Sequence, residues 1–276
     1  MGVDLWGMSE NEIRLVPLVL TQTDRFPWIG DLLQQGILNT LFLARAARRS
    51  VPLLPMIQQL GIQIDQQNIV YAGISQGAIF GASILATSPD LHRGHLGVPG
   101  IDYFTLLGRS KNFTGLFDLL QSAYPDPVDQ WINLAAIQLI WNQSDSSSFY
   151  PHLTQNLLTP TAKHVLLTPC QGDHQVAPIT IEVLARSDLS IKVMQPYART
   201  RSIPLVSETP YPHQGSAIVN WDYQAPFAPV GNRIPDLNYT DPHDQARTDS
   251  NHNHQMIHFW KTGEIIDVCN GQVCGL

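Results

Sequence analysis

The stretch YAGISQG (residues 71–77) lies between an apolar run and a segment rich in small residues. Its last five residues spell G-x-S-x-G, with Ser75 at the centre. A serine on a sharp strand-to-helix turn needs residues without bulk two positions before and after it, and Gly73 and Gly77 meet that need. The pattern therefore predicts that Ser75 is a nucleophile. The alternative is a glycine turn that happens to contain a serine.

The residues around this turn favour the nucleophile. The apolar run NIVYAGIS (68–75) is typical of a buried strand, and QGAIFGASILA (76–86) is typical of a helix. A helix that begins directly after the serine directs backbone N–H groups and a partial positive charge toward it. The N–H of Gln76 is accordingly the first donor expected to stabilise an oxyanion.

The rest of the chain alternates between strand-like and helical runs, which indicates an α/β fold with a mostly parallel sheet. Further strands are expected at 3–7 (VDLWG), 93–100, 164–169 and 215–223, and further helices at 31–49, 178–187 and 245–260. Between 101 and 158 only helical patterns occur. We therefore expect a single domain over residues 1–276 with a helical insertion at 101–158.

Composition limits the possible partners. The 276 residues are 43% hydrophobic and only 14% charged, with a formal net charge of −7. Nucleic acids and anionic membranes select for basic surfaces, so neither is expected as a partner. No apolar run approaches the roughly 20 residues of a membrane span. The start of the chain, MGVDLWGMSENE, lacks the basic and apolar regions of a secretory signal.

A nucleophilic serine requires a histidine to accept its proton and an acid to orient that histidine. On a strand-turn-helix elbow these groups follow in the order serine, acid, histidine, on loops after later strands. Asp173 fits the acid, because CQGDHQVAP (170–178) directly follows the strand predicted at 164–169. The alternative for Asp173 is an ordinary cap of the next helix.

Ten histidines compete for the role of base. His243, in DPHDQAR (241–247), lies on the loop after the last predicted strand and is the first choice. His252 with His254 ranks second, and His213 third. His252, His254 and His258 also have spacing that allows metal binding on one helical face. A solvated helix face is preferred, because no acidic or cysteine ligand completes the set, and no metal is predicted.

The three cysteines leave the compartment open. Cys269 and Cys274 are close enough in sequence to close a short disulfide loop, with Cys170 as a buried thiol. Two reduced thiols are an equal alternative. A disulfide would favour a secreted or periplasmic location.

Several of these segments together resemble the α/β-hydrolase superfamily, in particular its bacterial esterase and lipase-like members. They are YAGISQGAIFG, GHLGVPGIDY, CQGDHQVAP, DPHDQAR and HFWKTGEIIDVCNGQVC. The resemblance covers about residues 4–274. It implies carboxylic ester hydrolysis through an acyl-enzyme, with Ser75, Asp173 and His243 as the triad and without a cofactor. It also implies that 101–158 is a lid over the acyl pocket.

The chain departs from this superfamily at its N-terminal side. Members have several strands before the elbow and a loop there that supplies a second oxyanion donor, whereas this chain has room only for 3–7. The chain is accordingly either a fragment or a minimal hydrolase. A minimal form would take its second donor from the region of Trp6, Gly7 and Met8. It would also cover its open sheet edge with a partner chain, so we expect a homo-oligomer.

The expected function is hydrolysis of short- to medium-chain acyl esters, with a small-molecule ester as substrate. One alternative is a truncated, weakly active or inactive fold that serves as a binding or assembly module. Another is the same triad acting on an amide, a lactone or a polyester, which the sequence does not distinguish.

Overall fold

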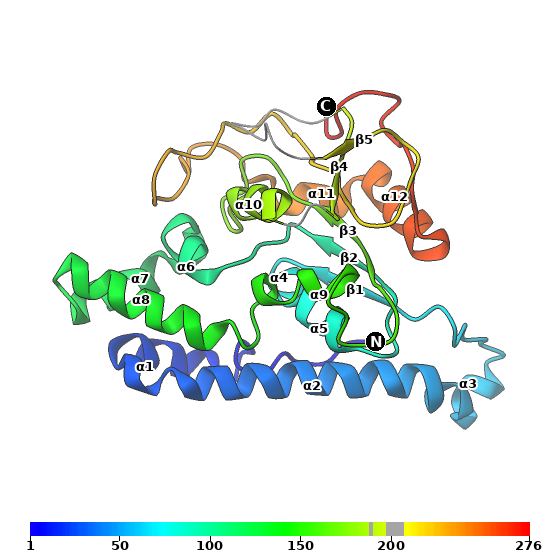
Figure 1. Cartoon of the computed structure of the whole chain (residues 1–276), viewed down its shortest axis with the longest axis horizontal. Coiled ribbons are helices and arrows are strands. Elements are labelled where there is room, and N and C mark those ends of the chain that lie inside the picture. The colour runs from blue at the N-terminus through cyan, green and yellow to red at the C-terminus, as the bar shows by residue number, and fades with distance from the viewer. Residues whose placement is uncertain (188–189, 197–206) are drawn as a thin grey trace.

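The computed structural model describes residues 1–187, 190–196 and 207–276. Its centre is a six-stranded sheet in the order β1-β2-β3-β7-β4-β5, with every neighbouring pair parallel (Figure 1). The strands are β1 (Val70–Ile74), β2 (Arg93–Gly97), β3 (His164–Thr168), β4 (Lys192–Met194), β5 (Glu208–Thr209) and β7 (Ala217–Ile218). A separate antiparallel pair joins β6 (His213–Gln214) to β8 (Glu264–Ile265). The prediction of an α/β fold with a mostly parallel sheet is confirmed.

Helices account for most of the remaining regular structure. The helices before and beside the sheet are α1 (Val16–Thr21), α2 (Pro27–Arg49), α3 (Pro55–Gln59), α4 (Gln76–Ile79), α5 (Gly81–Thr87), α10 (Ile179–Ser187), α11 (Gln245–Thr248) and α12 (Ser250–Thr262). The helices of the 101–158 segment are α6 (Tyr103–Leu106), α7 (Thr114–Ala123), α8 (Pro127–Trp141) and α9 (Pro151–Thr154).

The sheet separates two hydrophobic cores, because alternate residues of each strand face opposite sides. Val165 and Leu167 of β3 join the core shared with α2, α5 and α10, whereas Leu166 joins the core shared with α12. Helix α5 approaches the sheet closely at Gly81, where a side chain would overlap Leu96 of β2. These layers fix the carboxyl ends of β1, β2 and β3 along one edge of the sheet.

The structure corrects several predicted elements. Residues 3–7 form no strand, because this segment lies across α2, with the Trp6 amide next to Gly36. The helix expected at 76–86 is interrupted at Phe80, which ends α4 before α5 begins. The strand expected at 215–223 is regular over only two residues, as β7, and farther along only Trp221 forms an isolated bridge, to Cys170. Strands β4 and β5 were not predicted, since they are short and lack an alternating pattern.

The 101–158 segment is helical without a strand, as expected. Helix α7 packs against α1 and helix α8 against α2; in Figure 1, α2 runs below the sheet, and α7 and α8 lie to the left of the sheet, above α1. Trp141 is buried against Phe26 and stacks on Tyr103 with ring centroids 3.8 Å apart. In contrast, Leu139 of α8 is 71% exposed. Much of the segment therefore packs on the N-terminal helices, as part of the core on that side of the sheet.

Strand β1 lies at the end of the sheet, with no described strand on its outer side. A cavity of about 560 Å³ follows this edge and is bounded by the N-terminal residues and α2. Ala72 is exposed there. Within the described ranges, no helix is both long and apolar enough to cross a bilayer.

Candidate active site

Ser75 occupies a strained turn between β1 and α4. Its backbone dihedrals are φ 55° and ψ −119°, a combination that non-glycine residues rarely adopt and that is typical of functional sites. The Ser75 amide donates to the Gly97 carbonyl at 2.9 Å, which extends the β1–β2 ladder to the turn itself. Gly73 permits this geometry, because a side chain there would overlap the Gly77 carbonyl. The local prediction of a strand-turn-helix elbow is confirmed.

Gly77 plays a different part from the one expected. A methyl group at residue 77 would meet only the Tyr71 hydroxyl, at 3.7 Å. Tyr71 also donates from this hydroxyl to the Gly77 carbonyl at 2.7 Å. The turn therefore needs a residue without a side chain at position 73, but not at position 77.

Gln76 lies at the first position of α4, directly after the serine. No described residue accepts a hydrogen bond from its backbone N–H, which leaves that donor available to a ligand. Its side chain donates to the Tyr103 hydroxyl at 2.6 Å and so connects the elbow to the segment after β2. The unpaired N–H is compatible with the donor role predicted for Gln76.

Asp173 lies on the loop after β3 and is 1% exposed. One carboxylate oxygen, Oδ1, accepts the backbone N–H groups of Gln175 at 2.7 Å and Val176 at 2.9 Å. The other oxygen, Oδ2, lies 2.8 Å from Nδ1 of His243. Burial raises the pKa of Asp173, and the hydrogen bonds from His243, Val176 and Gln175 oppose this effect. Asp173 is thus both a cap of the following turn and the partner of His243.

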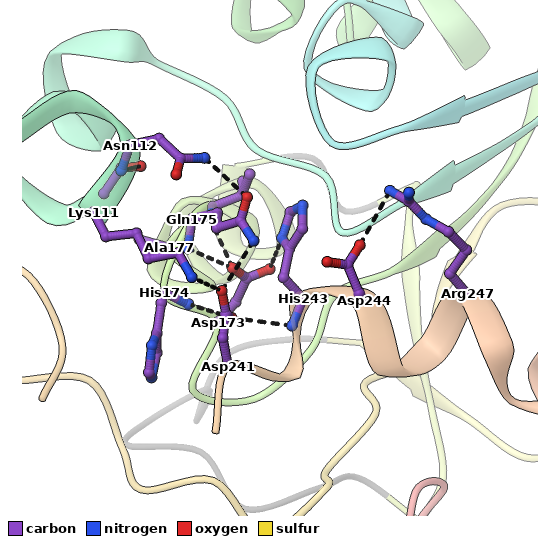
Figure 2. Close-up of polar contacts among 12 residues, drawn as sticks. Lys111, Asn112, Asp173, His174, Gln175, Ala177, Asp241, His243, Asp244 and Arg247 are labelled. Atoms are coloured by element: carbon purple, nitrogen blue, oxygen red, sulfur yellow. Dashed lines mark hydrogen bonds and ion pairs between the residues drawn. The ribbon is translucent and has the colours of Figure 1, made fainter. Parts of the chain in front are cut away.

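His243 lies in a short 3-10 helix, Pro242–Asp244, after the long loop that follows β7. It is 3% exposed, and its ring is held by Asp173. Figure 2 shows the ring beside Asp173, with its other nitrogen directed away from the carboxylate. This is the arrangement that orients an imidazole to accept a proton at Nε2.

Asp241 is a residue that the sequence reasoning missed. It caps the His243 amide at 3.1 Å and the His174 amide at 3.2 Å with Oδ1. Its Oδ2 accepts from Lys111 at 2.6 Å and from Gln175 at 2.9 Å (Figure 2). Burial acts to raise the pKa of Asp241, but these hydrogen bonds lower it to about 2. Asp-Pro before His243 is a helix-start signal that could have revealed this contact.

The structure brings Asp173 and His243 together but does not hydrogen-bond His243 to Ser75. The serine hydroxyl has no partner among the described side chains. Ile74, directly before the serine, nevertheless lines the same cavity of about 10 Å³ as His243 and Val98. The base and the end of β1 therefore lie on the same part of the sheet edge.

The region proposed for the second oxyanion donor lies beside the elbow helix. Leu5, directly before Trp6, lines the edge cavity with Gln76 and Gly77. Gly7 is buried against Leu33 of α2, and Met8 lines a small apolar cavity with Leu116 and Trp141. Trp6 is 44% exposed. These contacts do not place the backbone amide of Trp6, Gly7 or Met8 next to Ser75.

The other candidate bases lie elsewhere. His252 is buried on α12 and lies 3.0 Å from the Thr168 hydroxyl, whereas His258 contacts Glu264 at 3.1 Å. His254 is exposed on α12, and His213 lies in β6. The three helix histidines therefore do not converge, and the described residues contain no group of three ligands suited to a metal.

Cys269 and Cys274 are joined by a disulfide with a Cα–Cα distance of 5.4 Å, and Cys170 is buried and free. The loop lies next to the segment after β7, since the Asp222 amide donates to the Cys274 carbonyl at 2.8 Å and Trp221 forms an isolated bridge with Cys274.

Searches with protein-family models, curated proteins and solved structures gave no significant match to this chain. The site must therefore be interpreted from its own geometry.

Proposed function

We propose that the protein is a serine carboxylic ester hydrolase, built on an N-terminally shortened sheet of α/β-hydrolase type. The observation that carries the proposal is the buried contact of 2.8 Å between His243 Nδ1 and Asp173 Oδ2. It accompanies a serine in a strained elbow at the same sheet edge. A buried histidine–carboxylate pair near a strained serine is the arrangement used for acyl transfer.

In the proposed mechanism, His243 Nε2 accepts the Ser75 hydroxyl proton while Ser75 Oγ attacks the ester carbonyl. Asp173 keeps the proton of His243 on Nδ1 and stabilises the imidazolium that forms. The Gln76 N–H stabilises the oxyanion, and the second donor is assigned to Trp6, Gly7 or Met8. His243 then protonates the leaving alcohol, and water hydrolyses the acyl-enzyme by the same path. No cofactor takes part in these steps.

The proposed substrates are short- to medium-chain acyl esters. The insertion at 101–158 would form the lid, although much of it packs on α1 and α2. This packing supports a small acyl site rather than a long lipid groove. Rates on p-nitrophenyl esters should therefore be highest between acetate and octanoate and low for palmitate.

The deciding experiment compares wild type with Ser75→Ala on p-nitrophenyl butyrate. Ser122→Ala on α7 is a matched control, because that exposed hydroxyl only contacts the Asp118 carbonyl. We expect Ser75→Ala to lose activity and Ser122→Ala to keep it. A fluorophosphonate should label Ser75, and His243→Gln should prevent labelling.

One observation favours a second candidate function. Within the part of the chain that the structure describes, His243 bonds to Asp173 and not to Ser75. The fold would then act as a binding or assembly module with little or no activity. Equal hydrolysis by wild type and Ser75→Ala, together with no labelling of Ser75, would support this candidate. Hydrolysis of amides, lactones or polyesters without ester hydrolysis would redirect the proposal to those bonds.

A further inference from the structure

A second cavity, of about 230 Å³, lies beside the acid loop. Four segments surround it: the end of the short helix that contains Arg109, the acid loop at Gln171, the start of α10, and residues 227–233. Its walls include the apolar side chains of Pro178 and Phe227. Ser75, Asp173 and His243 do not line it. The cavity is therefore separate from the site of the proposed ester hydrolysis.

Gln171, which lines this cavity, carries a buried polar group. The residue is 4% exposed, and its Oε1 atom has no hydrogen-bond partner among the described residues. Buried carbonyl oxygens almost always have a partner, and leaving one unpaired is unfavourable. Oε1 itself has almost no accessible surface, so a ligand with a hydroxyl or N–H group would supply the missing donor once the Gln171 side chain turns toward the cavity.

The cavity is also locally positive, although the chain as a whole carries a net charge of −7. Its lining contains three arginines and one glutamate, which leaves two net positive charges: Arg109, Arg186 and Arg233 against Glu182. Guanidinium groups bind carboxylates through paired hydrogen bonds, so this lining favours an anion.

Two of the arginines have distinct environments. Arg109 is positioned by its own Nη1, which donates to the Thr105 carbonyl at 2.8 Å and to Asn232 Oδ1 at 2.9 Å. This leaves its other nitrogens as donors. Arg233 is exposed, and no described residue forms an ion pair or hydrogen bond with its guanidinium. Arg109 is thus fixed in place, whereas Arg233 can turn toward a ligand.

We propose that this cavity binds a small carboxylic acid with a hydrogen-bond donor at its other end, such as a hydroxylated aryl carboxylate. The carboxylate would pair with Arg109 and Arg233, and the donor would reach Gln171 Oε1. The ring would lie against Pro178 and Phe227. A water occupies about 30 Å³ in the liquid, so the volume suits one ring with a short arm. This binding is independent of the proposed ester hydrolysis.

The test is isothermal titration calorimetry on the full chain with three probes. They are para-hydroxyphenylacetate, phenylacetate, which lacks the donor, and para-hydroxyphenylacetamide, which lacks the charge. We expect the first to bind, and each of the others to bind about 10-fold more weakly. Because the probes differ and the protein does not, this comparison holds even where a variant fails to fold.

Three variants locate the contacts. Gln171→Met should remove the preference for the hydroxylated probe over phenylacetate, and Arg233→Gln should weaken both carboxylates about 10-fold. Arg49→Gln, an exposed arginine at the end of α2, is the control and should bind like wild type. The proposal is overturned if millimolar para-hydroxyphenylacetate gives no binding to wild type. Equal affinity for all three probes, or unchanged affinity in Arg233→Gln, would also overturn it.

Discussion

His243 Nδ1 lies 2.8 Å from Asp173 Oδ2, although 70 residues separate them in the chain. The contact forms because β3 and β7 are neighbours in a parallel sheet, so the loops that follow them begin at the same edge. Both side chains are buried, and the second oxygen of Asp173 is held by two backbone N–H groups. The carboxylate can therefore orient the imidazole with little freedom to rotate.

The first prediction concerns Asp173→Asn. The amide can present an N–H to His243 Nδ1, which would place the histidine proton on Nε2 and prevent it from acting as a base. We expect kcat for p-nitrophenyl butyrate to fall by roughly 1,000- to 10,000-fold. Asparagine keeps an oxygen for the amides of Gln175 and Val176, so the unfolding temperature should change little. A decrease in kcat of less than tenfold would contradict the assigned role.

The second prediction separates the two glycines of the elbow. Gly73→Ala should destabilise the protein by at least about 2 kcal/mol, because its methyl group overlaps the Gly77 carbonyl. Gly77→Ala should be neutral or stabilising by up to about 1 kcal/mol, since its methyl group has room and alanine favours helix.

The measurement for this pair is urea denaturation followed by circular dichroism, with ester hydrolysis as a second readout. Each variant is the control for the other, because both add one methyl group within the same turn. Equal destabilisation of the two would show that the elbow needs two positions without side chains.

The elbow was predictable because its signals are local. An apolar strand, Gly73 and a small-residue helix lie within 68–86, and the geometry around Ser75 follows from them. The contact of Asp173 with His243 was predictable from chain order combined with strand ends. Asp241 was not predicted, because its role depends on Lys111 and on loops that meet only in the folded chain.

Other features could not be predicted for tertiary reasons. Residues 3–7 were expected to form a short strand, yet they lie on α2, where Gly36 allows the Trp6 amide to approach closely. The strand predicted at 215–223 is regular only over Ala217 and Ile218, which pair with both β3 and β4, and farther along only Trp221 bridges to Cys170. Register and neighbour length, which a single sequence does not specify, decide such cases.

The third prediction tests Asp241 as a positioning residue. Asp241→Ala removes the cap of His243 and the contact with Lys111, so we expect a loss of about 1 to 2 kcal/mol in stability. We also expect kcat to fall, because His243 is then held less firmly. Asp241→Asn keeps an acceptor for the two amides and should restore most of kcat. Lys111→Met should reduce stability only slightly, since that pair is partly exposed. If Asp241→Asn and Asp241→Ala lose kcat equally, capping is not the relevant contact.

The fourth prediction concerns the open edge of β1. Ser75 donates toward β2, so strand alternation directs the Ala72 amide to the outer side, where no described strand pairs with it. Such an edge favours association, and we propose that a second copy of the chain covers it. Light scattering at micromolar concentration should detect a dimer or larger species. Ala72→Lys should shift the population to monomer, and a wild type that is already strictly monomeric would contradict the proposal.

The fifth prediction is a loss of stability in acid that originates in a buried histidine pair. His95 and His252 place their Nε2 atoms 2.9 and 3.0 Å from the same Thr168 hydroxyl. Burial lowers the pKa of His252 from 6.5 to about 4, with Asp249 partly opposing the effect. Burial, together with the neighbouring His252, also lowers the pKa of His95. Both rings are therefore neutral in the folded protein at neutral pH.

The unfolded chain binds these protons at higher pH than the folded chain does, so stability falls as the pH drops from 6.5 toward about 4. His252 alone should account for about 2 to 3 kcal/mol between about pH 7 and pH 4.5, as measured by urea denaturation. His252→Gln cannot take up the proton and should have a flatter pH profile. His254→Gln, an exposed neighbour on α12, should keep the wild-type profile. His252 is buried and His254 is exposed, so only the first substitution removes a buried imidazole. If all three profiles coincide, the acid sensitivity arises from other groups.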